Sequence, residues 1–348
     1  MKIVVLCGGL SPERNVSLSS GAKIATSLSR QGHGVVLADM YFGLEDYKRD
    51  LKDIFTDPPE LGSTVISEQA PDLKAVAQSR KIDTGSQFGD RVLELCSMAD
   101  IVFMALHGQC GEDGKVQAAF DLMNIKYTGS GFLGSAIAMD KDYTKRIVAP
   151  LGVLTPEWKT YPCKVVTAEK VMADLPLPVV VKPDNSGSSI GVSIARTKEE
   201  LSAALDAAGK ESHSVVVEKY ISGREIQVGI LGDEALPSIE IRPKTGFYDY
   251  KNKYQPGAAE EITPSPIPHE AETRVRAAAL KVFHALGLRA VSRADFIYDD
   301  EGRFWFLEIN TLPGMTPTSL VPQEAAVLGY DYTAVCEKII EESLRKYK

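Results

Sequence analysis

Two short runs of residues decide the fold, SRADFIY at 292–298 and FWFLEIN at 304–310. Both are rich in aromatic and β-branched residues, which favour β-strands. The polar segment DDEGR separates them and carries Gly302 near its end. Two such runs around a short glycine-bearing turn predict a β-hairpin. The next residues, TLPGMT at 311–316, predict a rigid loop whose backbone N–H groups face a substrate.

The polar face of this predicted hairpin carries oxygen ligands. Side chains alternate between the two faces of a strand, so Glu308 and Asn310 share one face. Asp295 lies on the partner strand and can reach the same face. Hard cations such as Mg²⁺ prefer oxygen ligands, with phosphate oxygens and water at the remaining positions. The pattern therefore indicates a Mg²⁺ site, and a polar face in contact with water is the alternative.

Length and composition narrow the class of protein. With 348 residues, the chain is long for a single core, and two or three domains are expected. The formal net charge of −8 argues against a nucleic-acid binder, which would carry a basic stripe. No apolar run is long enough to span a bilayer, so no membrane partner is expected. The five cysteines are scattered and lack metal-site spacing, which is typical of reduced thiols in a cytoplasmic protein.

The N-terminal segment predicts a parallel sheet. Residues 3–7 and 35–38 are apolar enough for buried strands, and a helix over 16–30 joins them. This βαβ pattern lacks the glycine fingerprint of a dinucleotide site, which disfavours a dehydrogenase.

A third buried strand, 101–106, runs directly into the loop 107–114. Ligands in open α/β sheets bind at the carboxyl ends of strands, where both Glu13 and His107 are expected. A loop histidine that only caps backbone groups is the alternative for His107.

The middle of the chain carries a candidate phosphate site. Strands predicted at 179–183 and 192–194 flank the small-residue loop 184–191. Such a loop exposes backbone N–H groups and serine hydroxyls to a polyphosphate. Lys182 stands at its base, and Lys141, which opens a predicted helix, adds a second cation. An unliganded hairpin and a surface lysine are the bland alternatives.

The last third of the chain predicts the remaining parts of a nucleotide site. Residues 218–221 form a linker whose backbone can pair with an adenine edge, and Glu225 can reach a ribose. The long polar stretch 242–269 predicts a functional lid. Helices are expected over 270–286 and 332–346.

Taken together, these motifs resemble those of the ATP-grasp enzymes and, more closely, of the D-alanine–D-alanine ligases. The resemblance covers nearly the whole chain through four blocks: Gly8–Arg14, His107–Gly114, Lys182–Gly191 and Glu308–Leu320. It implies an α/β ATP-grasp fold of three α/β units, with ATP between the central and C-terminal ones. The expected ranges are 1–130 for the N-terminal unit, 131–217 for the central unit, and 218–348 for the C-terminal unit with its lid at 242–269.

The resemblance also implies a reaction. ATP would drive the ligation of two D-alanines to D-alanyl-D-alanine through a D-alanyl phosphate, for peptidoglycan precursor synthesis. The cofactors would be ATP and two Mg²⁺ ions, with Mn²⁺ as a substitute, and the oligomeric state is left open with a homodimer as one candidate. Tyr254 matches the tyrosine of members that use an amine acceptor. A related ligase that accepts D-serine or D-lactate is the first alternative, and a non-catalytic nucleotide-binding regulator is the second.

Individual roles follow from the resemblance alone. The nucleotide would be held by Lys141, Lys182, Ser189, Glu218, Lys219, Ile221, Glu225 and Lys253. The metal ions would be held by Asp295, Glu308 and Asn310. The catalytic residues would be Glu13, Ser188, Tyr254, Arg293 and Gly314. The D-alanine substrates would contact Glu13, His107, Ser319 and Leu320.

Overall fold

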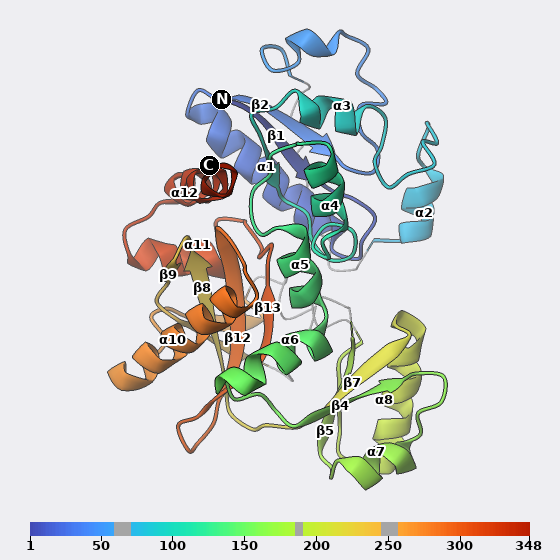
Figure 1. Ribbon diagram of the computed structural model, residues 1–348, viewed down its shortest axis with the longest axis vertical. Coiled ribbons are helices and arrows are strands. Elements are labelled where there is room, and N and C mark those ends of the chain that lie inside the picture. The colour runs from blue at the N-terminus through green and yellow to red at the C-terminus, as the bar shows by residue number, and fades with distance from the viewer. Residues whose placement is uncertain (59–70, 185–190, 245–256) are drawn as a thin grey trace.

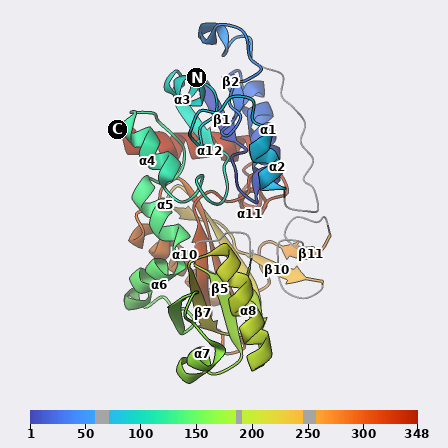
Figure 2. The same ribbon diagram turned by 90° about the vertical axis from the view of Figure 1, so that its right-hand side faces the viewer.

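The computed structural model describes residues 1–58, 71–184, 191–244 and 257–348. They form three sheets with helices packed against them, which is the expected mixed α/β fold. Figure 1 shows one sheet at the top of the molecule and the two others below it. The view in Figure 2 separates the helices that flank these sheets. Among the described residues, no helix combines the length and apolar character needed to cross a bilayer.

The N-terminal sheet is parallel, in the order β2-β1-β3, as predicted. Strand β1 is buried along almost its whole length, which is typical of strands covered on both faces. The predicted strands and helix are confirmed within two residues at each end. The elements of this unit are β1 (Lys2–Cys7), α1 (Arg14–Arg30), β2 (Gly34–Asp39), α2 (Leu73–Gln78), α3 (Val92–Ser97), β3 (Ile101–Met104) and α4 (Lys115–Leu122).

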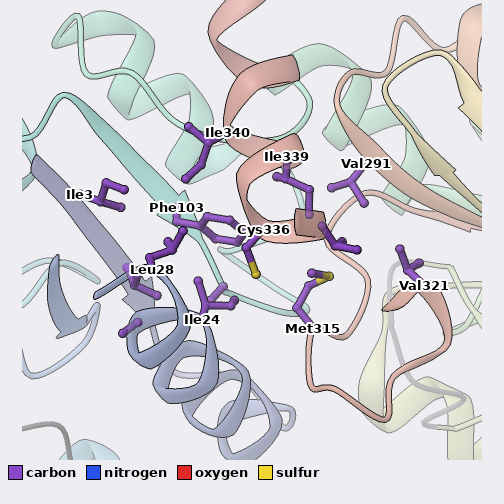
Figure 3. Close-up of a cluster of buried hydrophobic side chains, with 14 of the residues drawn as sticks. Ile3, Ile24, Leu28, Phe103, Val291, Met315, Val321, Cys336, Ile339 and Ile340 are labelled. Carbon is purple, nitrogen blue, oxygen red and sulfur yellow. The ribbon is translucent and has the colours of Figure 1, made fainter. Parts of the chain in front are cut away.

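The C-terminal end of the chain returns to this first unit. Helix α12 (Tyr332–Leu344), followed by a 3₁₀ turn, packs against α1. Figure 3 shows Cys336 and Ile340 of α12 next to Phe103 of β3, with Leu28 of α1 in the same apolar cluster. This placement could not be read from the sequence, where α12 only appears as an isolated amphipathic segment.

The largest sheet follows the order β11-β10-β8-β12-β13, and β9 pairs with β8. The predicted hairpin is confirmed as its β12–β13 pair. Its apolar face packs on α10, and α5 and α6 contribute Ala138 and Val148 to the same core. The elements here are α5 (Phe132–Met139), α6 (Lys141–Val148), β8 (Arg224–Leu231), β9 (Glu234–Ala235), β10 (Ile239–Pro243), β11 (Ala259–Ile262), α10 (His269–Ala285), β12 (Val291–Tyr298), β13 (Phe304–Asn310) and α11 (Leu320–Val327).

The predicted lid at 242–269 is not one continuous loop. Residues 259–262 form the edge strand β11, which pairs antiparallel with β10, and α10 begins at His269. A four-residue strand is too short for its alternation to stand out in the sequence. Residues 245–256 of this stretch lie outside the described residues.

The third sheet, β4-β7-β5-β6, is antiparallel throughout. Its elements are β4 (Trp158–Pro162), α7 (Ala168–Asp174), β5 (Val179–Pro183), β6 (Ser193–Ala195), α8 (Lys198–Glu211) and β7 (Ser214–Lys219). The boundary expected between residues 217 and 218 therefore falls inside β7. Similarly, α5 and α6 lie in the range expected for the central unit but bury side chains in the C-terminal core. Local patterns mark strands well, but they do not say which sheet a strand joins.

Candidate active site

The β12–β13 hairpin brings the predicted oxygen ligands together. Asp295 lies directly opposite Glu308, and Arg293 lies opposite Asn310. A register shift follows Asp295, and such irregularities commonly occur next to active sites. The Arg293 guanidinium donates to both carboxylate oxygens of Asp295, at 2.8 and 2.9 Å. The side-chain amide of Asn310 is 3.5 Å from the same carboxylate. The prediction that these polar groups share one face is confirmed.

A cavity of about 590 Å³ lies between the central and C-terminal sheets. This volume is within the usual range for small-molecule sites. Apolar walls come from Val180, Ile194 and Leu307. The predicted nucleotide and metal residues that line it are Lys141, Lys182, Glu218, Lys219, Ile221, Glu225, Asp295 and Glu308. These predicted residues come from two sheets, from α6 and from the loop after β7, and the structure places them around one space.

Lysines and glutamates form ion pairs around this cavity. The ammonium of Lys141 is 3.5 Å from Glu308 Oε2. Lys182 Nζ is 2.8 Å from Glu218 Oε2, and the Glu218 side chain is only 1% exposed. A third lysine, Lys145, lies 3.1 Å from Glu218 Oε1 and was not predicted. The Glu218 carboxylate is therefore paired with two lysines.

Burial and these ion pairs shift the pKa values of Lys145 and Glu218. Burial lowers the pKa of Lys145 to about 8, although Glu218 opposes the shift. Burial alone would raise the pKa of Glu218, but the two neighbouring lysines outweigh it and lower that pKa. Both groups are thus charged at neutral pH.

A second polar cluster lies where the N-terminal strands end. His107 follows β3 and is buried, with Nδ1 donating to the carbonyl oxygen of Leu312 at 2.9 Å. Its Nε2 is buried without a hydrogen-bond partner among the described residues. Burial lowers the pKa of His107, so the neutral ring presents Nε2 as an acceptor. Glu13 lies beside this loop, because a Cβ on Gly108 would come within 2.9 Å of its carboxylate.

Glu112 joins this cluster to the C-terminal unit, and it was not predicted. One of its carboxylate oxygens accepts from the N–H groups of Thr311 and Leu312, both at 3.0 Å. The other accepts from Gly108 at 3.2 Å. Burial, with the charge of Glu13, raises the pKa of Glu112 to about 7. Its position in the loop after His107 was visible in the sequence, but its partners are distant in the chain.

Several N–H groups of the loop after the hairpin differ from the prediction that they face a substrate. Those of Thr311 and Leu312 donate to Glu112, and that of Thr316 donates to the Ser319 hydroxyl at 2.9 Å. Gly314 lies against the same hydroxyl, since a Cβ there would come within 3.1 Å of it. Leu320 opens α11 with its side chain buried, which leaves its backbone at the helix N-terminus.

A buried carboxyl behind the hairpin was also missed. Glu324 of α11 is fully buried, and both of its oxygens lie 3.0 Å from the N–H of Gly229 on β8. A Cβ on Gly229 would overlap this carboxyl, so only glycine allows the approach. Gly229 lies opposite Arg293 in the sheet. Nothing in a helical sequence distinguishes such a glutamate from a surface one.

Four predicted site residues lie outside the described residues: Ser188, Ser189, Lys253 and Tyr254.

Comparisons with known proteins cover the whole chain. The family described as D-ala D-ala ligase N-terminus matches residues 2–130, and that described as D-ala D-ala ligase C-terminus matches residues 147–341. The D-alanine–D-alanine ligase of Pediococcus pentosaceus is 40% identical over 342 residues, which are 98% of this chain and 97% of the relative. That of Lacticaseibacillus casei is 38% identical over 348 residues, which are 100% of this chain and 97% of the relative.

Solved structures agree with these matches. The crystal structure of D-alanine–D-alanine ligase from Bacillus anthracis complexed with ATP has a TM-score of 0.76 and 30% identity, covering 99% of this chain and 98% of that one. The VanG D-Ala:D-Ser ligase from Enterococcus faecalis has a TM-score of 0.76 and 29% identity, covering 98% of this chain and 99% of that one.

Proposed function

The chain belongs to the D-alanine–D-alanine ligase family, and we propose that it joins two D-alanines at the cavity between its central and C-terminal sheets. It is an ADP-forming ligase of peptidoglycan precursor synthesis. The observation that carries the site assignment is the meeting of Lys141 and Lys182 with Asp295 and Glu308 around one space of about 590 Å³. Cations for a polyphosphate and carboxylates for a metal are both needed for phosphoryl transfer from ATP.

The reaction has two steps. A carboxylate oxygen of the first D-alanine attacks the γ-phosphorus of ATP, and ADP leaves. The amine of the second D-alanine then attacks the carbonyl carbon of the D-alanyl phosphate. Inorganic phosphate leaves with the bridging oxygen, and the attacking nitrogen loses a proton. Both steps gain mostly from positioning and from neutralising negative charge.

The nucleotide side of the cavity suits ATP. Lys141 and Lys182 are buried cations that line it, and they are assigned to the phosphates. Lys219 ends β7 and Ile221 follows that strand, and both are assigned to the adenine, together with the backbone of Glu218. Glu225 is assigned to the ribose. Ser189 and Lys253 keep their proposed phosphate contacts by family resemblance alone.

The donor set on the hairpin fits Mg²⁺. Asp295, Glu308 and Asn310 offer two carboxylates and an amide oxygen, the ligands preferred by this ion. In the described residues no three His, Cys, Asp or Glu side chains form a self-sufficient metal site. A small set of protein ligands leaves coordination positions open, and phosphate oxygens of a nucleotide can fill them. Two Mg²⁺ ions, or Mn²⁺ in their place, would supply neutralisation of the phosphate charge when bound.

The amino-acid side of the site is proposed at the contact between the N-terminal unit and the hairpin. Glu13 would pair with the ammonium of the first D-alanine, and the acceptor Nε2 of His107 lies in the same cluster. Arg293 and the N–H of Gly314 would stabilise the negative oxygen of the attacked carbonyl.

Ser319 and the Leu320 backbone would hold the second carboxylate at the start of α11, where the helix dipole favours an anion. Ser188 and Tyr254 are proposed to complete the site with Glu13, as the resemblance implies.

We propose a cytoplasmic location, which the free state of all five cysteines supports. Small molecules, ATP and D-alanine, are the proposed partners, without nucleic acid or membrane. A homodimer is proposed as well. Several exposed apolar side chains near α4 and α5 support it, among them Leu122, Phe132 and Leu133.

The test is a panel of D- and L-amino acids supplied with ATP and Mg²⁺ at neutral pH. We expect phosphate release with D-alanine, D-alanyl-D-alanine as the product on chromatography, and little D-lactate incorporation when both acceptors are present. A dipeptide or ester formed mainly with D-serine or D-lactate would instead support the related ligases. Phosphate release that no amino acid stimulates would contradict a ligase.

A further inference from the structure

Lys145 is a buried cation that the proposed mechanism does not use. It lies on α6, one helical turn after Lys141, and its side chain is 0% exposed. It does not line the ATP cavity. Isolated lysines are almost never fully buried unless they are paired, because removing the charge from water is costly. Its partner is Glu218, at 3.1 Å.

Glu218 has two cationic neighbours, and this decides the charge of the cluster. One of its oxygens faces Lys145 and the other faces Lys182, at 3.1 and 2.8 Å. A carboxylate paired with Lys182 alone would neutralise it. Because Lys145 is also paired with this carboxylate, the two lysines and Glu218 together carry one surplus positive charge. Only Lys182 among the two lysines lines the cavity, so this surplus is presented where a phosphate chain would lie.

Lys145 is also held by groups outside the central sheet. Its ammonium donates to the hydroxyl of Thr155, and that hydroxyl donates to the carbonyl oxygen of Phe306 on β13 at 3.0 Å. The ring of Trp158 lies 5.5 Å from the ammonium, within range of a cation–π contact. Lys145 therefore ties Glu218, on the central sheet, to the strand that carries Glu308.

We propose that Lys145 is a positioning residue that holds and neutralises Glu218, so that Lys182 keeps its charge for the phosphate chain of the nucleotide. This role deepens the proposed function and rests on it for the identity of the nucleotide. It acts through Glu218, without a contact between Lys145 and the substrate. Replacing Lys145 should therefore weaken the binding of nucleotide without weakening the binding of D-alanine.

The first test replaces the charge with an apolar chain of similar length, Lys145→Met. Binding of ADP and of a non-hydrolysable ATP analogue is measured by calorimetry at pH 7 with Mg²⁺ and without D-alanine. We expect affinity to fall by about tenfold, the scale of one charged hydrogen bond. The KM for ATP should rise similarly, while the KM for D-alanine stays within about twofold. The matched control is Arg146→Met, whose side chain is 63% exposed and pairs with Asp142 at the surface. It should bind as the wild type does.

The second test asks whether Lys145 acts through Glu218. The double variant Lys145→Met, Glu218→Gln removes one charge of each sign and restores the surplus charge on Lys182. It should bind nucleotide more tightly than Lys145→Met, and within about threefold of the wild type. Its net charge of +1 in this group equals that of the wild type, so it can be compared with the wild type alone if Lys145→Met does not fold.

Two results would overturn the proposal: a folded Lys145→Met protein with wild-type affinity, or a double variant that binds more than tenfold more weakly than the wild type. Because the calorimetric binding assays contain no D-alanine, their results are independent of whether the wild type makes the dipeptide. Failure of the ligase assignment would appear separately, as absence of dipeptide from the wild type.

Discussion

The apolar core beneath the N-terminal sheet and the core of the central unit differ in where their residues come from. The first combines β1, α1 and β3 with Val291 of β12, Met315, Val321 of α11, and the buried face of α12. It therefore continues from the N-terminal unit into the C-terminal one. The second draws every buried member from residues 161–217. One region is a joint core built by both ends of the chain, and the other is closed on itself.

The cavity proposed for ATP therefore lies between two separately packed regions. The joint block carries Asp295 and Glu308, and the N-terminal loops are tied to it through Glu112. The closed unit carries Lys182 and Lys219. A unit with its own core can open or move separately from its neighbours. The nucleotide would then be held between a fixed metal-binding side and a separately folded phosphate-binding side, with Lys145 connecting them.

The largest expected effect is on stability, and it tests whether the two cores unfold separately. Ile339→Ala in α12 and Leu175→Ala in the central unit each remove a buried side chain. Each should lower the free energy of unfolding by about 2–5 kcal/mol. The regions affected should differ. In hydrogen exchange, Ile339→Ala should loosen β1 and β3, while Leu175→Ala should loosen β5 and β7. Equal loosening of all four strands by both variants would mean that the two cores unfold as one.

Next in size is the loss of turnover on removing a carboxylate from the joint block. Glu308→Gln deletes one negative charge from the proposed metal site, and turnover should fall roughly a hundredfold. The fold should be retained, since Glu308 lies on the polar face of the hairpin. Glu301→Gln, at the exposed turn of the same hairpin, is the matched control and should be near normal. Phosphate release measures both. Near-normal activity in folded Glu308→Gln protein would remove Glu308 from the metal site.

The smallest expected effect is a pH dependence of nucleotide affinity. It arises from Lys145, which links the two regions. The pKa of Lys145 is about 8, lowered by burial, with Glu218 raising it and Lys182 and Lys141 lowering it further. Above this pH the ammonium loses its proton, and the surplus charge on the cluster is lost. Nucleotide affinity at pH 9 should be about fivefold weaker than at pH 7, because about nine-tenths of Lys145 is then neutral. Calorimetry across this pH range should detect the fall in nucleotide affinity, as a step near pH 8, in the wild type. The same step in Lys145→Met would assign it to another group.

The parts of the molecule that the sequence predicted correctly are those set by local patterns. The hairpin, the parallel sheet and the convergence of Asp295 with Glu308 follow from strand alternation and turn residues. Glu112, Lys145 and Glu324 were missed because their partners are remote in the chain. A charged residue on a helix or loop looks the same in sequence whether it is exposed or paired inside. The sheet to which β7 belongs, and the return of α12 to the first unit, are likewise tertiary facts.

The most direct test of the proposed reaction follows a single oxygen atom. D-alanine labelled with ¹⁸O in its carboxylate is supplied with unlabelled ATP, Mg²⁺ and the wild-type chain, and the released phosphate is examined by mass spectrometry. Attack of the carboxylate on the γ-phosphorus makes the carboxylate oxygen the bridge of the D-alanyl phosphate. The second amine then expels phosphate with that oxygen attached. One ¹⁸O is expected in each phosphate released with D-alanyl-D-alanine. Unlabelled phosphate, formed by transfer to water, would contradict it.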